Sequence, residues 1–332
     1  MSAPGSDPAV TPDRMRFDID AWDPGYGSSR DGTDDLDPSS AQVRINIEAS
    51  PRDWAAVQPC DVERPTHVLF VDGVRRIDAR VWVHQPDGAA VPGIAASYAA
   101  GVVCCTADRA TMLTSDVRRG LFTAAADAQG IDTRAGSYPL RPSHDSSIEE
   151  LSLALQRRLA DSEVDVSNNA RAQLADRDPA TVDIDLLVVD GPLRGRTHLP
   201  RVLGLVKTHR ATYLAEEQSA LITTLAAGER TPVFLIGTSW DRYSWYLRLP
   251  CPPGQPWAGV VRVEAPAELD AAAAIALADL SQVVLCRYAS CEYKDTRAPQ
   301  NLYPIGGLER ALRRRLGDPA LLYRALRAAA QA

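Results

Sequence analysis

Two short segments of the chain have nearly the same sequence and point to the same chemistry. One is Leu69-Phe-Val-Asp-Gly73 and the other is Leu187-Val-Val-Asp-Gly191. Each apolar run predicts a buried strand, and each strand ends on an aspartate, Asp72 or Asp190. Neighbouring carboxylates repel unless one takes up a proton or a divalent cation binds them. The repeat therefore predicts a metal site of the kind that hydrolyses phosphodiester bonds. The alternative is a pair of ordinary Asp-Gly turns.

A helix between the two segments supplies a third acid. We expect it to run from Ser146 to about Glu163, with an apolar stripe that continues onto Glu163. A carboxylate on a buried face requires a partner or a metal ion. The alternatives are that the helix ends before Glu163, leaving it solvated, or that Glu149 or Glu150 takes its place. The stripe consists of Ile148, Leu151, Leu155 and Leu159.

The order of predicted elements determines where these acids meet. We expect strands at 67–71, 77–84 and 93–105, a partly helical segment at 108–129, the acid-bearing helix, and a strand at 183–190. This order predicts an α/β, RNase H-like (PIWI-like) mixed sheet flanked by helices, with its first and fourth strands adjacent and parallel. The remainder reads as strands at 43–47, 202–209, 232–236, 245–249 and 260–263 and helices at 215–227, 267–280, 308–316 and 319–330.

Charge is distributed unevenly along the 332 residues. Residues 1–65 hold thirteen acids and six arginines, which accounts for the whole net charge of −7. We expect a flexible acidic tail at 1–40, an edge or partner-docking segment at 41–65, ordered structure from His67, and a nuclease domain at 66–332. The chain shows neither a signal peptide nor a membrane-spanning run, and its six cysteines suit the reducing cytoplasm.

Several basic residues are candidates for binding a phosphate backbone. Lys207 is one of two lysines in a chain that otherwise uses arginine, which suggests a requirement for a compact ammonium group. His209 shares its strand face. Arg248 and Arg262 lie among aromatic residues, an arrangement typical of grooves that bind nucleic-acid strands. Cross-strand packing with exposed arginines is the alternative for this region.

Taken together, the motifs resemble those of the NurA nuclease family. The matching segments, in the family's order, are Phe70-Val-Asp-Gly73, Val189-Asp-Gly-Pro-Leu193, Gly204-Leu-Val-Lys207, Arg262-Val-Glu-Ala-Pro266 and Leu302-Tyr-Pro304. The resemblance implies an RNase H-like homodimer that cleaves DNA with Mn²⁺ or Mg²⁺. It also implies a partner, a HerA-type hexameric ATPase, and a role in end resection during DNA repair or anti-phage defence.

The resemblance assigns roles by position. It makes Asp72, Glu163 and Asp190 the metal ligands and places Lys207 near the scissile phosphate. Archaeal members carry a histidine in the helix after the Tyr-Pro pair, whereas residues 305–312 here contain none. Asp295 or Asn301 is expected in its place.

Two further readings are open at this point. The missing histidine favours a weakly active or inactive scaffold subunit of a HerA-type ATPase complex. A resolvase or an Argonaute-like enzyme on the same fold is the other reading. Metal dependence separates the first from a nuclease, and substrate preference separates the second.

Overall fold

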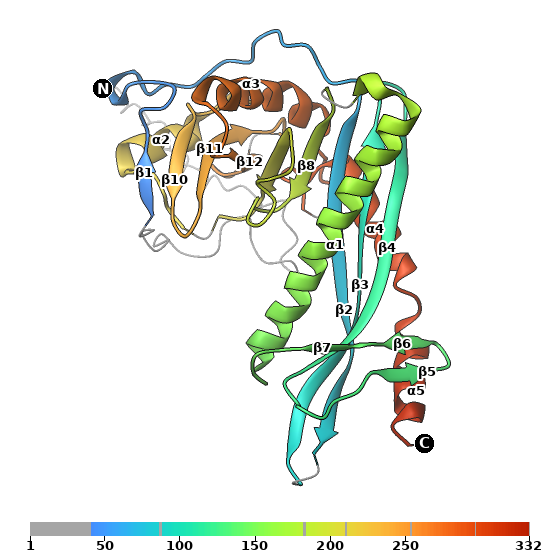
Figure 1. Cartoon of the computed structure of the whole chain (residues 1–332). Helices are drawn as coiled ribbons and strands as arrows, with labels where there is room; N and C mark the ends of the chain where they lie inside the picture. Colours follow the sequence, from blue (N-terminus) through green and yellow to red (C-terminus); the bar gives the residue numbers. More distant parts are fainter. Residues whose placement is uncertain are drawn as a thin grey trace, which may run out of the picture.

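The computed structural model describes residues 41–85, 88–181, 184–209, 211–252, 254–295 and 297–331, and these residues are built around a ten-stranded mixed sheet (Figure 1). The strand order is β1-β10-β11-β12-β9-β8-β2-β3-β4-β7. The strands are β1 Gln42–Arg44, β2 Val68–His84, β3 Ala90–Cys105, β4 Ala110–Thr123, β5 Ile131–Thr133, β6 Gly136–Tyr138, β7 Leu140–Pro142, β8 Leu186–Asp190, β9 Val202–Val206, β10 Phe234–Gly237, β11 Asp241–Arg248 and β12 Val260–Pro266. The helices are α1 Ile148–Arg177, α2 Glu216–Thr224, α3 Ala271–Arg287, α4 Tyr303–Arg315 and α5 Pro319–Ala329.

Five neighbouring strands, β4-β3-β2-β8-β9, have the RNase H-like arrangement. Strands β2, β3 and β4 are antiparallel, β8 pairs with β2 in parallel, and β9 pairs with β8 in parallel. The predicted fold class, a mixed α/β sheet with adjacent and parallel first and fourth strands, is confirmed. The two Asp-Gly segments therefore lie on neighbouring strands.

Helices cover both faces of this sheet. Leu155 and Leu159 of α1 pack with Leu69 on one face, and α3 and α4 pack on the other, where Leu308 and Phe70 belong to one apolar cluster. Successive residues of a strand point to opposite faces. Alternate residues of β2 and β8 therefore belong to the two different apolar clusters. Figure 1 shows α1 lying along the strands, which extend past the rest of the sheet as a long ribbon with α5 at its far end.

Two sequence expectations about the first strands were wrong. Asp72 does not end a strand, because β2 continues through it to His84 and pairs with β3 on both sides of a register shift between Ile77 and Ala79. The segment expected to be partly helical forms β4, which pairs with β3 from Ala110 to Thr123. More than half of the residues of β4 are only partly buried. Polar residues are therefore tolerated there, and the sequence shows no alternation of apolar and polar residues. Its strand state comes from pairing with β3.

Helix α1 is longer than expected and begins two residues later. It runs to Arg177, and Ser147 caps its start by accepting a hydrogen bond from the backbone N–H of Glu150 at 3.2 Å. Ile148 is exposed, so the predicted stripe was wrong at its first position. Leu151, Leu155 and Leu159 are buried as predicted.

Ordered structure begins before His67, contrary to expectation. Strand β1 pairs with β10 at one edge of the sheet, and Trp54 packs against the ring of Phe234. Glu48 forms an ion pair at 2.7 Å with Arg230, a fully buried residue. The predicted acidic tail at 1–40 lies outside the described residues. Within the described residues, no helix is both long and apolar enough to cross a membrane.

A buried polar cluster fixes the ribbon and gives a stability prediction. Asp78 accepts hydrogen bonds from Tyr138 Oη at 3.0 Å, from Ser97 Oγ and from Arg76 Nε. Burial, together with the Asp78 charge, raises the pKa of Tyr138 to about 12, so it donates at all ordinary pH values.

Since Tyr138→Phe removes a hydrogen bond to a charged acceptor, it should lower the free energy of unfolding by about 1.5–3 kcal/mol. Urea denaturation tests this, and the exposed Tyr323 provides a matched Tyr→Phe control. A Tyr138→Phe curve that overlaps wild type would contradict the role of the bond.

Candidate active site

Asp72 and Asp190 lie side by side on neighbouring parallel strands. The register of β2 and β8 pairs Val71 with Val189, so the next residue of each strand is the aspartate. Phe70 and Val188, two residues earlier, belong to the cluster beneath α3 and α4. Because the side-chain period of a strand is two, both carboxylates start from that same face. The sequence repeat thus places the two acids as neighbours.

The charge on Asp72 is poorly tolerated in this position. Burial raises the pKa of Asp72 well above its ordinary value, and the Asp190 charge raises it further, while Lys207 opposes the shift. Its Oδ1 accepts one hydrogen bond at 2.7 Å, from the backbone N–H of Gly73. A nearby cation would remove this electrostatic penalty.

Lys207 follows β9 and is held by a chain of polar contacts. Its Nζ donates to Asp190 Oδ2 at 2.7 Å and to Asn301 Oδ1 at 3.0 Å. Asn301 Nδ2 in turn donates to Asp295 Oδ2 at 2.7 Å. The structure therefore places Lys207 in contact with Asp190. Asp295 lies one contact further out, where it orients Asn301.

Glu163 is buried on α1, as the stripe predicts, but its contacts are with the other face of β2. Its carboxylate forms an ion pair with Arg196, and its Oε1 lies so close to Gly73 that a Cβ at that position would come within 2.5 Å. Burial raises the pKa of Glu163, and Arg196 opposes this. The Asp190 charge also acts on Glu163. Glu163 is thus near the two aspartates but already has a cationic partner.

Two charged residues at this site were missed by sequence reasoning. The charge of Glu309 in α4 contributes to the raised pKa of Asp72. Arg297 pairs with Glu309, and although burial opposes it, the charges of Glu309, Asp190, Asp295 and Asp72 raise its pKa. Glu309 is the single acid in residues 305–312, the stretch that lacks the expected histidine. Its position there is the signal that identifies it.

The acids fit a divalent cation through Asp72 and Asp190. In the part of the chain that the structure describes, no group of three or more His, Cys, Asp or Glu side chains is arranged to hold a metal ion. Mg²⁺ is commonly held by one or two carboxylates together with substrate phosphates and water. Two adjacent carboxylates, one with a strongly raised pKa, match that donor set. Glu163 and Asp295 do not complete it, since each has another partner.

Of the three residues expected to bind DNA, Arg262 and His209 are buried and Arg248 is partly buried. The Arg248 guanidinium donates to the backbone carbonyls of Ala258, Thr223 and Pro256, and so ties the end of α2 to the loop after β11. Arg262 is 7% exposed and pairs with Glu264 at 2.8 Å. The His209 ring is 2% exposed and packs between Tyr246 and Trp257. In this arrangement they serve packing, and none presents its polar group to a DNA backbone.

Among known proteins, the chain is similar to several solved structures. No protein-family model and no curated protein matches the chain. The chain is similar to the NurA nuclease from Sulfolobus solfataricus, with a TM-score of 0.41, 11% identity, and coverage of 79% of this chain and 84% of that one. It is also similar to human ENDOV, with a TM-score of 0.36, 15% identity and coverage of 76% and 84%. A structure of the catalytic domain of human Endonuclease V gives a TM-score of 0.36, 16% identity and coverage of 76% and 82%. The family that the sequence motifs resemble is therefore among the solved structures to which this chain is similar.

Proposed function

We propose that the protein is a divalent-cation-dependent deoxyribonuclease. One observation carries the proposal: Asp72 and Asp190 lie side by side at neighbouring parallel strands, with the Lys207 ammonium 2.7 Å from Asp190. The two carboxylates repel each other, and a bound Mn²⁺ or Mg²⁺ would remove this repulsion. Such a cation, when bound, activates water and neutralises charge on a phosphate.

Residues of the chain itself would hold the cation and position the substrate phosphate. Asp72 and Asp190 would hold the cation, and the hydrogen bond from Gly73 N–H orients the Asp72 carboxylate. Lys207 holds Asp190 in place and supplies a positive charge beside it, suited to a non-bridging phosphate oxygen. Asn301 fixes the other side of the ammonium, so that Lys207 needs little reorganisation when substrate binds.

The sequence resemblance supports the finer part of the proposal. We propose an exonuclease that resects DNA ends, with endonuclease activity as a second mode. It would act as a homodimer beside a HerA-type hexameric translocase in DNA repair or anti-phage defence. The motifs around Asp72, Asp190, Lys207 and Tyr303 are those that carry the resemblance.

A specific observation favours the scaffold alternative. Glu163 is already paired with Arg196, and the described residues hold no three-acid group placed for a metal ion. A subunit with so small a donor set would bind a cation weakly, and its main role would be to contact the translocase. The two candidates predict opposite metal responses.

The decisive measurement is DNA degradation with Mn²⁺, with Mg²⁺ and with a chelator, using the chain alone and with its translocase. A nuclease should cleave with either ion and stop with the chelator. Asp190→Asn should reduce cleavage about 100-fold or more, since loss of metal-assisted catalysis costs several kcal/mol of activation energy. The exposed Asp132 supplies an Asp→Asn control. Absence of cleavage under every metal and partner condition would rule out the nuclease and leave the scaffold.

A further inference from the structure

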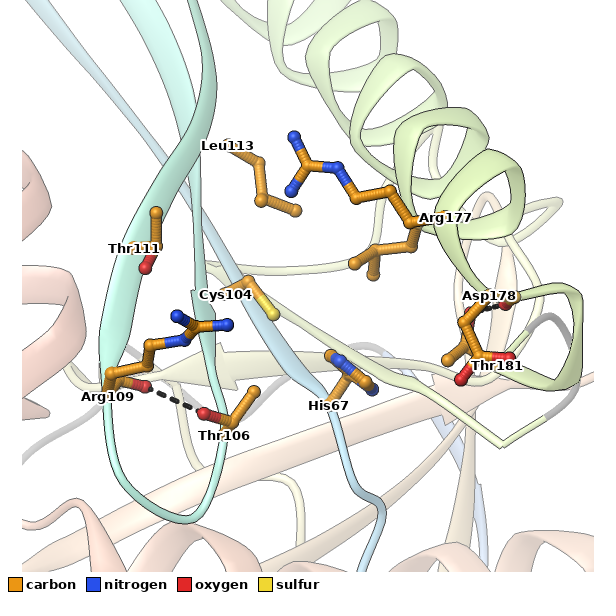
Figure 2. A pocket seen from close by; sticks show the side chains of 10 residues that line it. His67, Cys104, Thr106, Arg109, Thr111, Leu113, Arg177, Asp178 and Thr181 are labelled. Carbon is orange, nitrogen blue, oxygen red and sulfur yellow. Dashed lines mark hydrogen bonds between the residues drawn. The ribbon is translucent and has the colours of Figure 1, made fainter.

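A cavity opens on the face of the sheet opposite the Asp72 carboxylate. It lies between the β3–β4 turn and the C-terminal end of α1 and has a volume of about 310 Å³ (Figure 2). Cys104 forms part of its floor, pairs with Leu69 across β2 and β3, and belongs to the apolar cluster beneath α1. Asp72 is three residues further along β2 and starts from the other face. The cavity is therefore separate from the candidate active site.

Two arginines from different elements face this cavity. Arg109 comes from the β3–β4 turn and Arg177 from the last turn of α1, and Figure 2 shows the Arg109 side chain beside Cys104 and the Arg177 side chain extending from the helix on the other side. Among the residues that the structure describes, neither guanidinium group forms an ion pair or a hydrogen bond. Two like charges held over one cavity repel each other, so an anion between them would be stabilised by both.

The surroundings add polar donors and an apolar surface. His67 and Thr111 line the rim, and Leu113 and Leu174 form an apolar wall. Asp178 also lines the cavity, and its carboxylate accepts a hydrogen bond from the N–H of Ala180 at 3.1 Å. That contact fixes the Asp178 carboxylate without engaging either arginine.

Electrostatics at the cavity floor agree with this placement. Burial and the Asp185 charge raise the pKa of the Cys104 thiol to about 11, while Arg109 and Arg177 both oppose the shift. The thiol is thus neutral at ordinary pH and acts as part of the apolar floor. Both arginines are close enough to the floor for their charges to act on the pKa of Cys104.

We propose that this cavity binds a mononucleotide-sized phosphate monoester, with its phosphate held between Arg109 and Arg177. Guanidinium groups bind phosphate through paired, charge-assisted hydrogen bonds, and two of them suit a dianion. The cavity volume is at the lower end of the range for small-molecule sites, which matches a mononucleotide. Leu113, Leu174 and Cys104 provide the apolar surface against which a base would pack.

Calorimetric titration of the full chain with deoxyadenosine monophosphate tests the proposal. A chelator is present throughout, so that the outcome does not depend on any nuclease activity. We expect saturable binding, weaker binding of inorganic phosphate, and no measurable binding of deoxyadenosine. Arg109→Ala and Arg177→Ala should each weaken the nucleotide's affinity about tenfold or more, because each removes charge-assisted hydrogen bonds.

The exposed Arg324 on α5 provides a matched Arg→Ala control that should bind as wild type. Nucleotide binding that neither Arg109→Ala nor Arg177→Ala weakens would overturn the proposal, as would absence of binding by the wild-type protein. Tighter binding of a single-stranded oligonucleotide without terminal phosphates, lost in the same two variants, would also overturn it. That result would identify a contact to the nucleic-acid backbone.

Discussion

Asp72→Asn should abolish metal-dependent DNA cleavage while leaving the protein at least as stable as wild type at neutral pH. Loss of one of the two carboxylates proposed to bind the cation should remove several kcal/mol of stabilisation from the reaction, a reduction of about 100-fold or more. Asparagine has the same shape and can still accept the hydrogen bond from Gly73 N–H. It carries no charge, and therefore relieves the repulsion from Asp190. Activity and stability should thus change independently.

The pH dependence of stability follows from the same residue. Because the pKa of Asp72 is higher in the folded protein than in the unfolded chain, the folded protein binds more protons in the interval between the two values. This contribution to stability is complete below the unfolded pKa and is lost as the pH rises through the folded pKa. Asp72→Asn should remove this dependence.

Chemical denaturation at several pH values, with and without Mn²⁺, measures both effects. Mn²⁺ should stabilise wild type at neutral pH, since a ligand that binds only the folded state raises the free energy of unfolding. It should have a much smaller effect on Asp72→Asn. The matched control, Asp132→Asn, should cleave and respond to Mn²⁺ as wild type does. Full cleavage by Asp72→Asn would exclude this site as the catalytic centre.

Glu264→Gln should cost about 3–5 kcal/mol in the free energy of unfolding, because it leaves two buried arginines without a counter-charge. Glu264 is fully buried, and its Oε1 accepts from Arg242 at 2.9 Å and from Arg262 at 2.8 Å. Glutamine keeps the size of the side chain and removes the charge. Urea denaturation gives the change in stability, and the exposed Glu268 supplies a Glu→Gln control.

The same substitution should also reduce cleavage, because Glu264 positions the segment after Asp190. Its Oε2 accepts the backbone N–H of Leu193 at 3.0 Å. That segment passes so close to Gly204 that a Cβ there would lie 2.9 Å from the carbonyl oxygen of Gly191. Glu264→Asp, which retains the charge, should recover part of the stability. Wild-type stability in Glu264→Gln would show that the buried ion pairs contribute little.

The sequence was sufficient to predict the pairing of the two aspartates but not the full set of groups around them. A repeated apolar run ending in aspartate identifies two similar strands, and their order along the chain makes them neighbours. Helical periodicity likewise placed Glu163 on a buried face. Periodicity does not specify the contacts of a buried carboxylate, and Arg196, from a distant loop, proves to be its partner.

The residues that were missed depend on tertiary packing. Glu309 lies on a short helix whose direction is set by Leu308 and Leu312 packing under the sheet. It is the single acid among the arginines of that helix, but no local pattern shows that its charge acts on Asp72. Arg248 and Arg262 were misjudged because arginines next to aromatic residues occur both in nucleic-acid grooves and in buried ion-pair networks. Their partners, backbone carbonyls and Glu264, are fixed only in the folded chain.

The candidate site draws its side chains from segments that are far apart along the chain. Asp72 is near the start of the described residues, and Asn301 and Glu309 are close to the end. Contacts between such distant segments close large loops and form slowly. During synthesis on the ribosome, the set of side chains around the two aspartates is therefore incomplete until residue 309 has emerged and α4 has packed. A partly made chain would hold its two acidic strands without the groups that position them, which delays any hydrolytic activity until α4 has been synthesised and has packed.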